Sequence, residues 1–166
     1  MENFWNTIHF FAYKFLNKLY ILSLKPAIWY FNSSLVKKVF EKNGRTPEMA
    51  LKDFTFALTD KRVGQSSFFA FGIMIAMPLV FLFGLYNFYV LIFNSAFEVY
   101  PIVIFGLLSC LLNYFLLFRY DKYIKYFKKF GKQPREWKVK WAWISAGVIL
   151  FPYLVLASSF IAMLPK

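Results

Sequence analysis

Cysteine, histidine and acidic side chains are scarce in this sequence. Its 166 residues include one Cys, one His and eight Asp or Glu, against 20 Lys or Arg. A single Cys excludes a disulfide scaffold, and the sequence has no metal-binding cluster, Gly-rich phosphate loop or nucleophile elbow. Its few carboxylates are dispersed and form no acid–base pair. The sequence therefore predicts no catalytic residue, no metal site and no cofactor.

Apolar side chains are abundant. Hydrophobic residues make up 60% of the chain and aromatic residues 23%, whereas about 45–50% of an average soluble domain is apolar. This composition excludes a disordered tail, a collagen-like fibre and an ordinary soluble enzyme. The net charge of +12 adds basic surfaces to an apolar chain. Together these properties predict a multi-pass membrane protein.

Three apolar runs, uncharged except for Lys140 at the start of the third, are long enough to cross a bilayer, which requires about 20 residues for a hydrocarbon core about 30 Å thick. Backbone groups in lipid must be hydrogen-bonded within the protein, so each run is expected to be a helix. The predicted fold is an all-α membrane protein in which amphipathic cytoplasmic or interfacial helices precede three transmembrane helices. We expect the spans at residues 67–93, 99–118 and 139–164.

Lysine and arginine predict the orientation of these spans. Ten of them lie in residues 1–65 and nine in residues 119–140, whereas residues 94–100 hold none and the C-terminus holds Lys166 alone. Basic loops remain on the cytoplasmic side of a membrane. The N-terminus is therefore expected in the cytoplasm and the C-terminus outside. Plentiful Lys, Phe and Asn suggest an AT-rich genome and a bacterial cytoplasmic (inner) membrane.

Residues 1–65 are expected to form amphipathic helices and residues 66–166 the transmembrane region, with a basic loop at 119–138. Pro26 is expected to start a second helix, Gly44 to end it and Thr46 to begin a third. The N-terminal helix has the pattern of a segment in the membrane interface, with His9 as an interfacial aromatic. Packing on the protein's own spans or on a partner fits equally well, and a fourth span at residues 8–24 is a further alternative.

The basic loop combines lysines with aromatic residues at helical spacing. Anchoring of the cytoplasmic side is the plain interpretation, and each lysine near an anionic leaflet is attracted by about 1 kcal/mol. A specific site for an acidic partner or an anionic phospholipid is the alternative, and nucleic acid is the least favoured partner. The residues predicted for such a site are Lys122, Lys125, Lys129, Lys132, Tyr123 and Phe127.

Small, polar and proline residues in the spans predict where helices pack. Pairs of small residues four apart let helix backbones approach closely, asparagine can hydrogen-bond between helices, and proline bends a helix or forms a hinge. Asn113 is the foremost candidate for an interhelical contact. The full set is Gly72, Ala76, Pro78, Gly106, Asn113, Ala142, Ala146 and Pro152.

These features together favour a non-catalytic inner-membrane subunit that scaffolds or anchors a larger protein assembly, such as secretion, conjugation, motility or envelope machinery. Other membrane-protein subunits and anionic phospholipids are its expected partners. A homo-oligomeric channel lined by Asn113, the span serines and the kinked helices is the second hypothesis. An immunity protein against a membrane-active toxin is the third.

Overall fold

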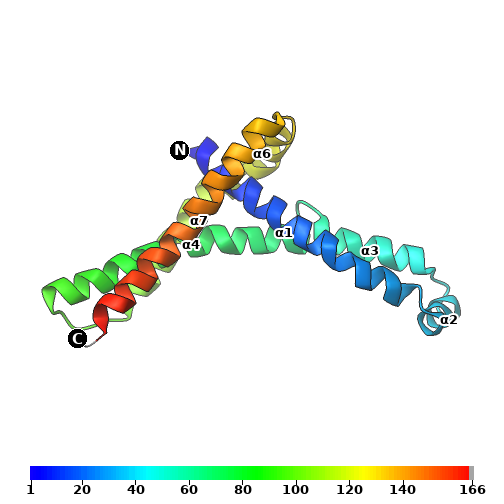
Figure 1. Ribbon diagram of the computed structural model, residues 1–166, viewed down its shortest axis with the longest axis horizontal. Helices are drawn as coiled ribbons and strands as arrows, with labels where there is room; N and C mark the ends of the chain where they lie inside the picture. Colours follow the sequence, from blue (N-terminus) through cyan, green and yellow to red (C-terminus); the bar gives the residue numbers. More distant parts are fainter. Residues whose placement is uncertain (165–166) are drawn as a thin grey trace. The chain divides into compact units, whose positions relative to one another are not determined.

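The chain is all-helical, with no strand in the described part. The computed structural model describes residues 1–164, so Lys166, which was counted at the outer end, lies outside them. In chain order the elements are α1 (Glu2–Phe31), α2 (Ser34–Lys42), α3 (Pro47–Thr59), α4 (Gln65–Phe93), α5 (Tyr100–Asn113), the π-helical turn η1 (Tyr114–Phe118), the 3-10 turn η2 (Arg119–Asp121), α6 (Lys122–Gly131) and α7 (Arg135–Met163) (Figure 1).

Three helical stretches are long and apolar enough to cross a membrane, at Gln65–Phe93, Tyr100–Gly131 and Arg135–Met163. The predicted all-helical chain with three such helices is thereby confirmed. The second stretch runs beyond the predicted end at Phe118. Its backbone is left-handed at Tyr120 and Asp121, with φ values of 63° and 51°, and this interruption separates the apolar part from the basic helix α6.

The chain forms two compact units, and their limits differ from the predicted division at residue 65. Unit 1 contains residues 1–12 together with 71–166, and unit 2 contains residues 13–70. The first twelve residues thus group with the predicted transmembrane region. They do so because every residue from Asn6 to Phe10 is buried. A helix lying in a membrane interface would instead leave one face exposed.

Unit 2 is built from the second part of α1, followed by α2 and α3. The ring of Phe31 contacts the rings of Phe40 and Phe54 at centroid distances of 5.8 and 6.0 Å. At the other end, the Tyr13 hydroxyl donates to the Thr59 carbonyl at 2.7 Å. These contacts hold α3 alongside α1, as Figure 1 shows.

The ends of α2 and α3 follow their sequence signals. Gly44 has a φ of 65°, a conformation that suits glycine after a helix end. It lets the Arg45 and Gly44 amides donate to the carbonyls of Phe40 and Glu41 at 2.9 and 3.1 Å. The Thr46 hydroxyl accepts from the Met49 amide at 3.2 Å, which caps the start of α3.

The prediction that Pro26 starts a new helix is wrong, because α1 continues through it to Phe31. Proline inside a helix removes one backbone hydrogen bond and costs about 3 kcal/mol. The Pro26 ring is exposed, so it displaces no neighbouring side chain. The ring contacts of Phe31 fix the C-terminal end of α1 on unit 2, and this packing overrides the local preference.

The core of unit 1 lies where residues 1–12 (the N-terminal segment) meet the helices of the predicted spans. Ile8, Met74, Met77 and Leu117 are buried together, and they come from α1, α4 and η1. Partly buried Trp5, Phe71 and Phe118 pack around them. Burying a large apolar side chain stabilises a fold by about 1.5–3 kcal/mol in water, so this cluster fixes the N-terminal segment against α4 and η1.

Helix α4 lies beside α7 within unit 1 (Figure 1). The contact is close at Gly84, where a Cβ atom would lie 3.1 Å from both the Leu156 amide nitrogen and Val155 Cγ1. Three residues further on, the Asn87 amide donates to the Ser159 hydroxyl at 3.2 Å. The lack of a side chain at Gly84 therefore allows the two backbones to approach.

Candidate functional site

The candidate site lies at the junction between η1, η2 and α6, where the N-terminal segment of unit 1 packs. The last carbonyls of a helix have no partner within the helix. Here side chains replace that partner: Lys122 Nζ donates to the Phe115 carbonyl at 3.3 Å, and Asn6 Nδ2 donates to the Leu116 carbonyl at 2.9 Å. The helix interruption thereby becomes a binding place for the N-terminal segment.

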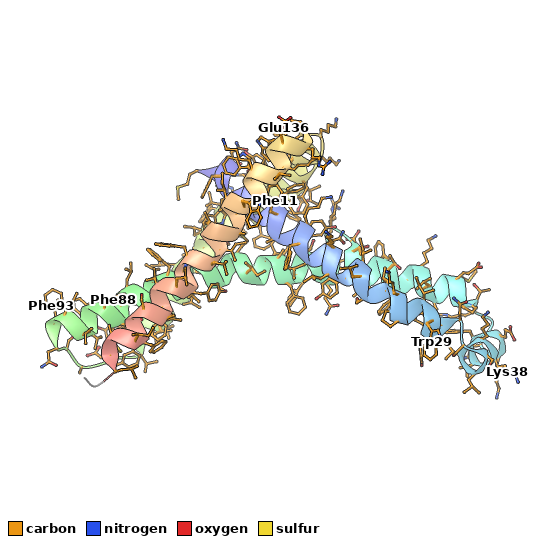
Figure 2. All side chains as sticks on the ribbon, in the orientation of Figure 1. Phe11, Trp29, Lys38, Phe88, Phe93 and Glu136 are labelled. Carbon is orange, nitrogen blue, oxygen red and sulfur yellow. The ribbon has the colours of Figure 1, made fainter. Side chains whose placement is uncertain are left out.

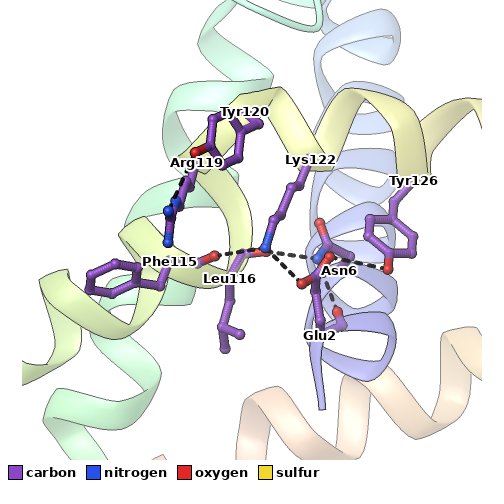
Figure 3. A network of polar contacts seen from close by, with 8 residues as sticks. All are labelled: Glu2, Asn6, Phe115, Leu116, Arg119, Tyr120, Lys122 and Tyr126. Atoms are coloured by element: carbon purple, nitrogen blue, oxygen red, sulfur yellow. Dashed lines mark hydrogen bonds and ion pairs between the residues drawn. The ribbon is translucent and has the colours of Figure 1, made fainter.

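An ion pair reinforces this junction (Figure 3). Lys122 Nζ lies 2.7 Å from Glu2 Oε2, and the Tyr126 hydroxyl donates to Glu2 Oε1 at 3.3 Å. The hydrogen bond from the Lys122 ammonium group is the main cause that lowers the pKa of Glu2 below its ordinary value. The Glu2 carboxylate is therefore already bonded within the chain, and Lys122 is held in one position.

Aromatic rings hold the same segment from its other side. Phe10 packs edge-on against Phe127 and Phe130 at centroid distances of 5.4 and 5.7 Å. Phe11 contacts Trp137 at 6.0 Å. Such aromatic pairs contribute about 0.5–1.5 kcal/mol beyond the burial of their surface, so residues 1–12 are firmly attached to α6 and to the start of α7.

His9 is inside the protein, which corrects its prediction as an interfacial aromatic. Its side chain is 0% exposed and stacks on Phe71 at 4.5 Å, with Tyr123 at 5.7 Å and Phe127 at 5.1 Å. Neither ring nitrogen has a hydrogen-bond partner among the described residues. Burial among these rings lowers the pKa of His9 to about 3, because the charged imidazolium would lose its solvation.

The predicted basic site divides into two parts. Tyr123 and Phe127 are 6% and 3% exposed, so these rings are core residues of unit 1 and are closed to lipid or a partner. They lie on the side of α6 that faces the N-terminal segment, which the sequence pattern could not identify. Lys125, Lys129 and Lys132 are exposed.

A depression of about 480 Å³ lies over this exposed part. Its lining residues are Glu2, Tyr120, Lys122, Lys125, Tyr126 and Lys129. An adjoining depression of about 500 Å³ shares Tyr120 and is lined mainly by rings: Tyr114, Phe115, Phe118, Arg119 and Tyr120. The Arg119 guanidinium lies over the Phe115 and Tyr120 rings, at 5.8 and 5.0 Å from their centroids.

Asn113 joins three helical segments of unit 1. Its Nδ2 donates to the carbonyls of Met74 and Ser109 at 3.0 and 2.8 Å, and its Oδ1 accepts from Trp5 Nε1 at 3.0 Å. The Ser109 hydroxyl also donates to the Ile75 carbonyl. Asn113 thus lies at a contact between α5, α4 and the N-terminal segment.

The small residues predicted at helix contacts have other surroundings. Apart from the glycine's own stretch of helix, no described atom lies within 4 Å of a Cβ placed at Gly72 or Gly106, and Gly72 and Ala146 are exposed. The chain's own helices therefore make no close backbone contact at the two glycines. Small-residue spacing shows only that another helix could approach closely at that place. The close approach in this structure occurs at Gly84, which belongs to none of the predicted pairs.

The remaining predicted packing residues lie inside long helices. Pro78 and Pro152 are within α4 and α7, which run on through them, and Pro152 is buried. Ala76 and Ala142 are half-buried. Among residues 1–164, no group of three or more His, Cys, Asp or Glu side chains is placed to hold a metal ion.

Comparisons with protein-family models, with curated proteins and with solved structures found no match for this chain.

Proposed function

We propose that this chain is a non-catalytic, multi-pass subunit of a bacterial inner membrane that scaffolds or anchors a larger protein assembly. Its N-terminal region and α6 face the cytoplasm, its C-terminus is outside, and its partners are other membrane-protein subunits. The distribution of Lys and Arg supports this orientation. The apolar surface of unit 2 is the observation that carries the assembly role.

Unit 2 presents an apolar row along α1 that the rest of the unit leaves open. Phe15, Leu19, Leu22 and Trp29 are 64%, 46%, 54% and 78% exposed (Trp29 is labelled in Figure 2). Intervals of four, three and seven residues place them on one face of a helix. Large exposed apolar side chains that follow one face of a helix mark an interaction surface. We assign this row to a protein partner.

Charge beside the row suits an acidic partner. Lys18 and Lys25 occupy positions next to it on α1, and two lysines along one flank favour carboxylates on the opposing surface. The Phe15–Trp29 row and its lysines together resemble the apolar centre and charged rim of a protein interface.

The polar residues of the spans support an anchor more than a channel. A channel requires polar groups that face water, whereas both amide atoms of Asn113 are bonded to neighbouring helices, and Asn87 is bonded to Ser159. Each is 1% exposed. These residues therefore act as helix contacts within one chain.

The test is purification of the tagged chain from its own membranes in mild detergent, followed by native mass measurement and protein identification. We expect one or more other proteins in fixed stoichiometry. The variant Leu22→Lys with Trp29→Lys should lose them, because two charges now interrupt the row, while the variant chain stays in the membrane fraction.

A matched control uses Val63, which is 74% exposed in the turn before α4. Val63→Lys also places a charge on an exposed apolar position and should retain the partner. A single homogeneous homo-oligomer would contradict the scaffold proposal and favour the channel. Retention of the partner by the double variant would contradict the assignment of the row.

A further inference from the structure

The two adjoining depressions at the η1–α6 junction combine the two features of an amphiphile site. The first is basic: Lys122, Lys125 and Lys129 follow one another at intervals of three and four residues on one face of α6 and line a space of about 480 Å³. The second is lined by rings of η1 and its neighbours. The shared residue Tyr120 makes them continuous.

Charge in the first depression is unbalanced. One carboxylate, Glu2, lines it, and this carboxylate is already bonded to Lys122 and Tyr126. No carboxylate of the described residues pairs with Lys125 or Lys129. The Lys129 ammonium lies over the Tyr126 ring at 5.7 Å from its centroid. Two ammonium groups thus face the space without a counter-charge.

The position of this space in the chain fits the headgroup level of a membrane. The apolar stretch of the second candidate span ends at Phe118, and the lysines begin four residues later. Of the rings in the second depression, Tyr114, Phe115 and Phe118 belong to the end of this apolar stretch, and Tyr120 follows it. A ligand with a charged head and an apolar tail can therefore place each part against side chains of its own kind.

From these observations we propose that the paired depressions bind an anionic phospholipid. Its phosphate-bearing headgroup contacts the ammonium groups of Lys125 and Lys129, and its acyl chain lies along Phe115 and Phe118. Arg119 lines the second depression next to the shared residue Tyr120 and is a further donor to the phosphate. The proposal rests on the cytoplasmic placement of α6 in the proposed function and assigns the lipid contact to specific residues.

The test is native mass spectrometry of the purified chain, titrated with phosphatidylglycerol and, separately, with phosphatidylcholine. We expect saturable binding of phosphatidylglycerol and at least about tenfold weaker binding to Lys125→Gln with Lys129→Gln, since each lysine contributes about 1 kcal/mol. Both side chains are exposed, and circular dichroism checks that the helices persist.

The matched control is Lys37→Gln with Lys38→Gln, which removes the same charge from exposed positions of α2 in unit 2. It should bind the lipid as the natural chain does. Equal losses in both double variants would overturn the site, because they would indicate general charge attraction. Equal binding of phosphatidylcholine would overturn it as well.

A final competition experiment distinguishes a bound lipid from a bound free anion. Inorganic phosphate at millimolar concentration should leave phosphatidylglycerol bound, because it cannot use the ring-lined depression. Full displacement by inorganic phosphate would contradict the phospholipid assignment. The measurement uses the purified chain without any protein partner, so its failure is distinguishable from failure of the assembly proposal.

Discussion

Trp5 donates a hydrogen bond from its indole nitrogen to Asn113 Oδ1, at 3.0 Å and across 108 positions of the sequence. Through Asn113 the bond continues to the Met74 carbonyl of α4. One amide side chain therefore holds the N-terminal segment, α5 and α4 together. This contact leads to the first prediction.

Replacement of Asn113 by Leu should destabilise unit 1. The change removes the bonds to Trp5 and Met74 and leaves the indole N–H without its acceptor. Interhelical hydrogen bonds in membranes contribute about 0.6 kcal/mol on average and at most about 1.7 kcal/mol. We expect a loss of about 1–3 kcal/mol in the free energy of unfolding, measured by titration of the folded chain with sodium dodecyl sulfate.

Ser158 provides the control for this experiment. Its exposed hydroxyl donates only to the Val155 carbonyl of its own helix, so Ser158→Ala should change the free energy by less than about 0.5 kcal/mol. A double-mutant cycle with Trp5→Phe should show coupling between Trp5 and Asn113. Additive effects would refute the bond as a stabilising contact.

Two glycine substitutions should have opposite effects. Gly84→Ala places a methyl group 3.1 Å from the Leu156 backbone nitrogen, and we expect the strain to cost about 1 kcal/mol or more. Gly72→Ala meets no atom within 4 Å and should be neutral or stabilising by up to about 1 kcal/mol. The same unfolding titration compares them, and equal effects would contradict the close α4–α7 contact.

His9 should remain neutral down to strongly acidic pH. As the one histidine of the chain, it gives a single imidazole signal in a nuclear magnetic resonance titration. With its pKa lowered to about 3, the signal should not move between pH 8 and pH 5. A midpoint near the ordinary value of 6.5 would show that the imidazole reaches water.

The same shift predicts how stability depends on pH. Between the ordinary pKa of His9 and its lowered value, the unfolded chain binds the proton more readily than the folded chain. The free energy of unfolding should therefore fall as the pH decreases below 6.5. In His9→Phe this part of the decrease should disappear, and an unchanged pH profile in that variant would argue against a buried imidazole.

The Glu2–Lys122 ion pair contributes to stability in a different pH range. The pKa of Glu2 is lowered below the ordinary value of 4.5 by Lys122, so the ion pair stabilises the N-terminal segment above that pH and weakens as the carboxylate is protonated at lower pH. Protection factors of the amides of residues 5–10, in which hydrogen exchange is corrected for its intrinsic dependence on pH, should fall on acidification below pH 4.5. Glu2→Gln should have lower protection factors at neutral pH and lack this further decrease, whereas an identical acid response would contradict the role of the pair.

The sequence predicts the helices of this chain much better than their contacts. Apolar runs longer than a bilayer requires can satisfy their backbone hydrogen bonds in lipid only as helices. Gly44 and Thr46 are local signals for a helix end and a helix start, and the surrounding helices do not override them. The prediction at Pro26 is wrong because local chemistry favours a new helix there, whereas the contacts of Phe31 at the end of α1 maintain the existing one.

The contacts of the N-terminal segment could not be predicted for a different reason. Asn6, Thr7 and His9 suggest the polar side of an amphipathic helix, yet all three are buried, because α6 packs on a side that the pattern assigns to water. The Glu2–Lys122 pair joins residues 120 positions apart, and any of the chain's many lysines could have been its partner. Gly84 lies in an apolar run without a small residue four positions away, so nothing in the pattern marks it.

Cysteine labelling from each side of the membrane tests most directly that the chain crosses it three times with both basic regions in the cytoplasm. In a Cys110→Ala background, single Cys substitutions are placed at Lys38 in unit 2, at Val99 between α4 and α5, and at Lys129 in α6. An impermeant maleimide should label Lys38→Cys and Lys129→Cys only in inverted vesicles, and Val99→Cys only in intact cells. Labelling of Lys38→Cys and Lys129→Cys from opposite sides would contradict the account.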